Sequence, residues 1–221
     1  PTLEGELYRA VDAILNDSEE TISTYQKAIN AASDNVGFRL ETLRQKNGDV
    51  DLTQLFVGSQ GTLGIITEAI LKTAPYTPAS TLIVAAFANI DDALEVGEQL
   101  GRFQPSALEL VEPELFEFVK KHNSLELPAE LLIDGKPATT LFIEAQNLSD
   151  RALGKFTKQV VKTVSRYTEA YLTTTDFEER EKLWSYRYAT ASFMGFDVGG
   201  KAAAPIIQNV GVPACATIST A

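Results

Sequence analysis

Three evenly spaced glycines are the residues of this 221-residue chain that most suggest a ligand site. Gly58, Gly61 and Gly64 recur at every third position in a loop before an apolar segment. Glycine allows positive φ and close backbone approach, so the N–H groups of such a loop can bind an anion such as phosphate. The spacing differs from the G-x-G-x-x-G of a Rossmann loop. Spacing alone leaves open a ligand-binding loop or a glycine-rich turn before a strand.

Two arginines form the second candidate site. The segment 177–193 predicts a helix on which Arg180, Trp184 and Arg187 share one face at i, i+4 and i+7. Two arginines with an aromatic ring between them could bind a carboxylate through paired hydrogen bonds. The helix also carries three glutamates, so a surface helix with ion pairs between its own residues is the alternative.

Composition excludes several function classes. The formal net charge of −11 argues against nucleic acid and anionic membrane surfaces as partners. Cys215 is the only cysteine and His122 the only histidine, which excludes an intrachain disulfide and argues strongly against a Ser-His-Asp triad or a zinc site. No segment is long and apolar enough to predict a transmembrane helix. We therefore expect a soluble, cytoplasmic protein with no metal site among the residues of this sequence.

Apolar periodicity predicts an α+β protein with two domains. In the first part we expect a helix at 3–15, a second helix capped by Asp17 or Ser18, a short helix at 51–56 and a strand at 65–72. Pro75 and Pro78 mark the boundary. The second part predicts strands at 81–88, 107–111, 139–146 and 169–175, with helices at 91–103, from 114, and at 151–167. Apart from the small extra helix from 114, this is the β-α-β-β-α-β order of a ferredoxin-like antiparallel sheet with helices on one face. Helix 177–193 and a strand near 203–212 follow.

The residues around the glycines resemble a known family signature. Segment 51–71 reads DLTQLFVGSQGTLGIITEAIL. It resembles the end of the flavin domain in FAD-linked oxidases of the vanillyl-alcohol-oxidase type, the group of D-lactate dehydrogenase, glycolate oxidase and D-2-hydroxyglutarate dehydrogenase. Gln60 stands where these proteins usually have Glu. Segment 34–38 looks like their N-x-x-G-Y element.

The resemblance implies that the loop lines FAD. The residues implied for cofactor binding are Gly58, Ser59, Gly61, Thr62, Gly64, Ile65 and Ile66, with Asn35 as a further candidate. Leu183–Arg187 resembles the family's L-W-x-x-R element, whose arginine faces the substrate carboxylate, so Arg187 is implied as a substrate-binding residue. Segment 205–213 resembles the strand P-x-x-E-D-V-x-V-P, but Gln208 and Asn209 replace its acids.

The expected function is therefore oxidation of a D-2-hydroxy acid by hydride transfer to FAD. Residues 1–75 would be an incomplete C-terminal part of the FAD-binding domain, and residues 76–221 a ferredoxin-like substrate domain without its C-terminal part. The family's catalytic histidine segment is expected beyond this sequence, so the chain alone is expected to be inactive. The alternative is a non-catalytic ferredoxin-like module that binds a ligand or another subunit. Homo-oligomers are possible, and the electron acceptor is undetermined.

Overall fold

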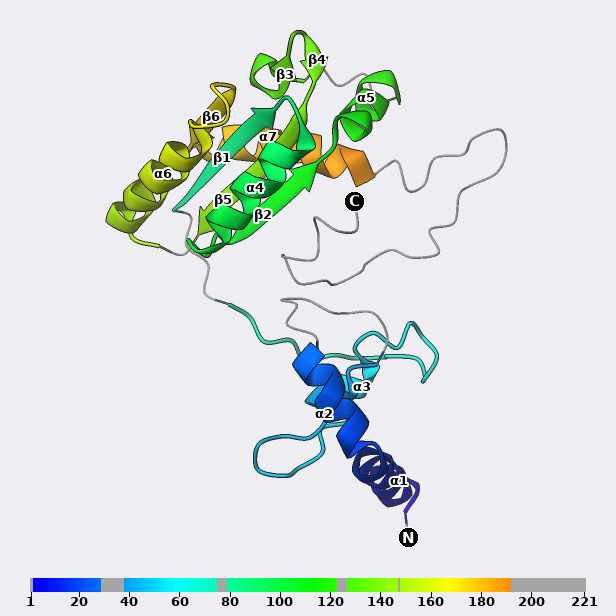
Figure 1. Ribbon diagram of the computed structural model, residues 1–221. Coiled ribbons are helices and arrows are strands. Elements are labelled where there is room, and N and C mark those ends of the chain that lie inside the picture. The colour runs from blue at the N-terminus through cyan, green and yellow to red at the C-terminus, as the bar shows by residue number, and fades with distance from the viewer. Residues whose placement is uncertain (1, 29–37, 75–78, 123–126, 147, 192–221) are drawn as a thin grey trace. The chain divides into compact units, whose positions relative to one another are not determined.

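The computed structural model describes residues 2–28, 38–74, 79–122, 127–146 and 148–191 (Figure 1). The chain divides into two compact units, of which one includes Pro1–Lys72 and the other is Thr73–Pro205. Each unit is described by itself. Among the described residues, no helix is both long enough and apolar enough to cross a membrane.

The first unit is helical. Its elements are α1 (Leu3–Asp17), α2 (Glu19–Ala28), the 3-10 helix η1 (Leu40–Thr42) and α3 (Thr53–Phe56). Thr2 caps α1, because its hydroxyl oxygen accepts a hydrogen bond from the Gly5 N–H at 3.2 Å. Leu15 and Leu43 are its buried apolar side chains among the described residues. The helices that apolar spacing predicts here are all present, with small differences at their ends.

The strand expected at 65–72 is absent. This segment has no regular secondary structure, and Ile65 and Ile70 are 93% and 96% exposed. A strand needs a partner for its backbone hydrogen bonds, and within the described part of the chain no strand pairs with residues 65–72. The segment has the apolar sequence of a buried strand. The prediction is wrong because the sequence pattern does not show whether a partner strand is present.

The second unit is built on an antiparallel sheet with the strand order β2-β5-β1-β6. Its strands and helices are β1 (Ser80–Phe87), α4 (Ile90–Gly101), β2 (Ala107–Val111), α5 (Pro113–His122), η2 (Ala129–Leu131), β3 (Leu132–Ile133), β4 (Lys136–Pro137), β5 (Thr139–Gln146), α6 (Asp150–Val164), β6 (Tyr171–Thr174) and α7 (Phe177–Ala189). The antiparallel α+β class predicted from the sequence is confirmed.

Alternation along the central strand β1 creates two apolar cores. Ile83, Ala85 and Phe87 face α4 and α6, whose buried side chains complete the first core. Leu82 and Val84 face the opposite side and pack in the second core with residues of α5, η2 and α7. Because β1 is buried on both faces, it reads as a continuous apolar run, which is why its position is clear in the sequence.

The helices predicted to share one face, α4 and α6, do so, and α7 covers the other face of the sheet (Figure 1). The sequence did not indicate which face α7 would cover. A small hairpin, β3–β4, is also new, because the segment was expected to be a loop. Its turn residues Asp134 and Gly135 have φ of 52° and 73°, which is the Asp-Gly turn that favours two-residue hairpins.

Candidate functional site

The glycine loop is a turn fixed by its own backbone. Gly58 and Gly61 have φ of 79° and 78°, a conformation in which a side chain is strained. The carbonyl of Ser59 accepts hydrogen bonds from the Thr62 N–H at 3.0 Å and from its hydroxyl at 2.7 Å. Ser59 is 7% exposed. The loop therefore has a defined shape at the positions that the sequence singles out for the cofactor.

The outer side of this loop is open. A Cβ built at Gly61 or Gly64 would meet no atom within 4 Å, so the backbone there is reachable from outside. Ile65 and Ile66, which follow at once, are mostly exposed. An accessible backbone beside apolar side chains suits a flat, partly apolar cofactor, so these residues fit the FAD expected from the sequence. Asn35 lies outside the described residues.

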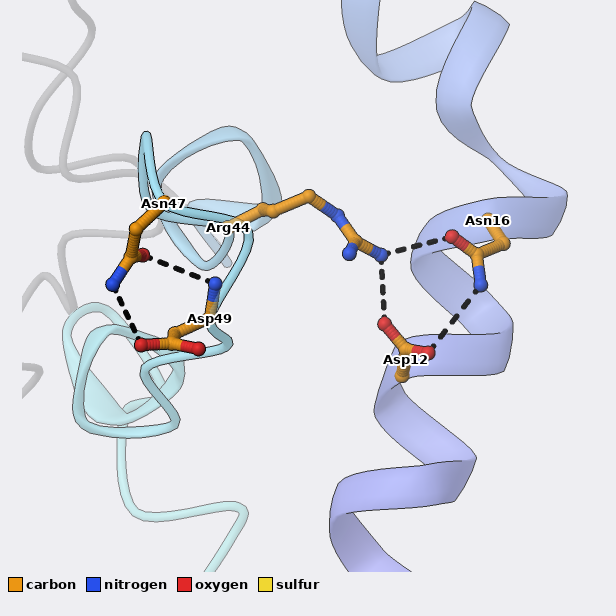
Figure 2. A network of polar contacts seen from close by, with 5 residues as sticks. All are labelled: Asp12, Asn16, Arg44, Asn47 and Asp49. Carbon is orange, nitrogen blue, oxygen red and sulfur yellow. Dashed lines mark hydrogen bonds and ion pairs between the residues drawn. The ribbon is translucent and has the colours of Figure 1, made fainter.

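The chain segment that leads into α3 and the glycine loop is fastened to α1 by one arginine. Arg44 donates hydrogen bonds from Nη2 to Asp12 at 2.8 Å and to the side-chain oxygen of Asn16 at 2.9 Å (Figure 2). Beyond it, the Asn47 side chain closes a turn by binding both the N–H and the carboxylate of Asp49. The Arg44 contacts thus join the segment before α3 to helix α1, and the Asn47 contacts fix the turn that follows Arg44.

Asp51 lies two residues before the start of α3. It accepts hydrogen bonds from the hydroxyl and the N–H of Thr53, and these bonds lower the pKa of its carboxyl group below the ordinary value. The carboxylate is thus favoured at the start of the helix, where negative charge is stabilising. The sequence correctly predicts a short helix that begins near this residue.

Helix α7 positions the arginines. Asp176 caps it by accepting a 2.9 Å hydrogen bond from the Glu179 N–H. Leu183 and Trp184 are buried against the sheet, and Trp184 stacks on Phe142 of β5 with ring centroids 5.3 Å apart. This packing fixes which side of the helix faces the strands.

Arg180 is a buried residue with a buried partner. Its Nη1 lies 3.1 Å from Oε1 of Glu144 on β5, and both side chains are 6% exposed. Ser80 adds a 3.4 Å hydrogen bond to the same carboxylate oxygen. The Nε of Arg180 has no hydrogen-bond partner among the described residues. The pair is closed off from solvent, which makes Arg180 unsuitable for binding a diffusing substrate.

Arg187 lies nearer the surface and pairs with a different strand. Its Nε donates a 2.6 Å hydrogen bond to Oε2 of Glu109 on β2, with side-chain exposures of 32% and 38%. Its Nη1 lies 3.3 Å from the hydroxyl of Thr190. Among the described residues no hydrogen bond engages Nη2. Arg187 is therefore the arginine of α7 that can still receive a carboxylate.

The structure separates the two arginines that the helix pattern groups together. Each is paired with a glutamate of the sheet, and neither ion pair is formed with the helix's own glutamates. Glu109 and Glu144 alternate with apolar residues in their strands, a pattern that fits a solvent-facing side chain as well as an ion pair. Periodicity could not assign the partners, because each pair joins segments far apart in the chain.

Comparison with known proteins identifies the family. Residues 77–218 match the model described as FAD linked oxidases, C-terminal domain. The glycolate oxidase subunit GlcD of Bacillus subtilis is 37% identical over 90 residues, which are 38% of this chain and 19% of that protein. The mitochondrial D-lactate dehydrogenase [cytochrome] of Kluyveromyces lactis is 27% identical over 167 residues, 72% of this chain and 27% of that protein.

A third relative has a related name. The D-2-hydroxyglutarate dehydrogenase of Pseudomonas putida is 27% identical over 121 residues, which cover 55% of this chain and 12% of that protein. The chain thus aligns with no more than about a quarter of each of these relatives. Because the family model covers well over half of the sequence, this chain belongs to the FAD linked oxidases.

Proposed function

We propose that this chain is part of an FAD-dependent dehydrogenase that oxidises a D-2-hydroxy acid by hydride transfer to the flavin. The observation that carries the proposal is Arg187, a half-buried arginine whose Nη2 has no hydrogen-bond partner among the described residues, in a unit that matches the FAD linked oxidases. A guanidinium is the side chain best suited to bind a carboxylate. Arg187 would therefore hold the acid group of the substrate.

We assign residues 1–75 to the C-terminal part of the FAD-binding domain and residues 76–221 to the substrate domain. The unit boundary at Lys72 and the family match from residue 77 support this division. Within the first part, Gly58, Ser59, Gly61, Thr62 and Gly64 would offer backbone groups to FAD. Ile65 and Ile66 would lie against its ring, and Asn35 is a further candidate.

In this proposal the cofactor supplies the hydride acceptor and the chain supplies position and charge. Arg187 would bind the carboxylate of the substrate and hold it in one orientation. A fixed orientation lowers the activation free energy, because the bound substrate has already lost most of its translational and rotational freedom. The apolar segment around Ile65 and Ile66 would exclude water from the flavin ring.

The proposal extends to the topology of the second unit and to the cellular location of the protein. The second unit would be ferredoxin-like, a proposal supported by its element order and by the strand order β2-β5-β1-β6. A cytoplasmic location stays a prediction, since the name of the Kluyveromyces lactis relative places that protein in mitochondria.

The proposal is tested with the flavin-loaded whole protein that carries this chain. Under anaerobic conditions, D-lactate, glycolate or D-2-hydroxyglutarate should bleach the flavin absorbance, and L-lactate should not. Arg187→Ala should lower kcat/KM by roughly 30- to 1000-fold, which corresponds to about 2–4 kcal/mol of transition-state binding. Failure of every 2-hydroxy acid to reduce the flavin would refute the proposed function.

A further inference from the structure

Glu109 holds Arg187 in a defined orientation, and we infer that it is a positioning residue for substrate binding. The inference rests on the function proposed above, in which Arg187 binds the substrate carboxylate. Glu109 lies on β2 and contacts the arginine only through Oε2, which accepts the 2.6 Å hydrogen bond from Nε. The role would thus be exerted through Arg187 and not on the substrate itself.

The hydrogen bonds of the guanidinium leave one direction free. Nε is engaged by Glu109, and Nη1 contacts the hydroxyl of Thr190. Thr190 is itself fixed, since it is buried and its hydroxyl donates a 2.7 Å hydrogen bond to the Arg187 carbonyl. Among the described residues, Nη2 has no such partner. A carboxylate would therefore be received at the Nη2 end of an already oriented group.

The outer ion pair is too exposed to contribute much to folding. Both side chains keep about a third of their surface in solvent, and pairs of this kind stabilise proteins little. An arginine that is ordered before its ligand arrives loses less conformational freedom on binding. Preorganisation of Arg187 is thus the physical effect that this short contact can supply.

The register of the sheet explains how one helix serves both pairs. Glu109 lies opposite Phe142 on β5, and Ala107 lies opposite Glu144, so the two glutamates occupy diagonal positions on one sheet face. Arg180 and Arg187 are about two helical turns apart on α7, and each pairs with one of these glutamates. The buried pair fixes α7 on the sheet, and the outer pair then orients Arg187.

A double-mutant cycle in the flavin-loaded whole protein tests the inference. Glu109→Ala should raise KM for the 2-hydroxy acid by roughly 10- to 100-fold, with a smaller change in kcat, because the arginine is misplaced and not lost. In the Arg187→Ala background the same change should have no further effect, since Glu109 acts only through Arg187. Glu109→Gln should recover part of the loss, because its amide oxygen can still accept from Nε.

Glu98→Ala is the matched control, because Glu98 is exposed on α4, which covers the opposite face of the sheet. It should leave KM unchanged, and thermal unfolding of all variants should differ little. A Glu109→Ala loss that persists in the Arg187→Ala background would overturn the positioning role, as would an effect no larger than that of the control. If Arg187→Ala itself leaves kcat/KM unchanged, the proposed role of Arg187 fails instead.

Discussion

Arg180 and Glu144 form an ion pair at 3.1 Å in which both side chains are almost wholly buried between α7 and β5. Two charges in such a place are desolvated, and each depends on the other for compensation. The pair ties the helix that carries Arg187 to the central part of the sheet. Its integrity is therefore expected to matter for folding rather than for catalysis.

Removal of one partner should be costly. Arg180→Met leaves the Glu144 carboxylate buried without its cation, and we expect a loss of about 3–5 kcal/mol in the free energy of unfolding. Urea unfolding followed by tryptophan fluorescence measures it, because Trp184 is the only tryptophan and lies in the adjacent core. The double variant Arg180→Met/Glu144→Leu should regain most of the loss. Arg187→Met is the control on the same helix, with a cost of roughly 1 kcal/mol or less.

Tyr167 should titrate unusually high. A 2.6 Å hydrogen bond to Glu95 raises the pKa of its phenol, while the hydrogen bond from Gln99 lowers it. The protonated phenol is thus favoured in the folded chain. The resulting stability is fully present below the ordinary tyrosine pKa of about 10 and is lost as the pH rises through the raised value.

NMR titration of the Tyr167 ring tests whether Glu95 and Gln99 shift the pKa of Tyr167 in these directions. A Tyr167→Phe variant identifies the ring signals. Glu95→Gln should move the pKa down toward its ordinary value, because the charged acceptor is lost. Gln99→Leu should move it further up, because a donor to the phenol oxygen is removed. Shifts of the same sign in both variants would contradict the stated causes.

Gly61 should resist replacement even though space surrounds it. A side chain at φ of 78° is strained by its own backbone, so Gly61→Ala should destabilise the loop by about 1–2 kcal/mol. Amide hydrogen exchange of residues 58–64 would report faster opening. Gly97→Ala on α4 is the comparison, since its Cβ also meets no atom and its φ is not in the left-handed range. Equal exchange in both variants would show that the loop does not need glycine at position 61.

The exposed apolar segment after the glycine loop should cause this chain to self-associate and to bind apolar dyes. Ile70 and Leu71 are 96% and 82% exposed, which is unusual for neighbouring large apolar side chains. Ile70→Thr/Leu71→Gln should reduce binding of an apolar dye and any concentration-dependent self-association measured by sedimentation. Glu68→Gln serves as a control for a polar change nearby. Unchanged dye binding in the double variant would place the apolar surface elsewhere.

The sequence pattern predicted the helices and strands of the second unit well, because each of them depends mainly on the residues of its own segment. The bounds of β2 and β5 agree with the prediction, since both are strand-like segments flanked by proline or polar residues. The strand expected at 65–72 failed because a strand exists only with a partner. The partners of Arg180 and Arg187 could not be predicted, because helical periodicity places a residue on a face but does not say which strand lies beneath it.

The strand order of the sheet constrains how this unit can fold. Ile83 of β1 pairs with Ile143 on one side and with Thr173 on the other, so the central strand has no sequence-adjacent neighbour in the sheet. The chain between β1 and each of these partner strands must close before the strands can pair, which slows folding compared with a chain of hairpins. During synthesis, β1 would leave the ribosome long before either of its partners. Until residues 171–174 emerge, the edge of β1 that later pairs with β6 has no strand partner.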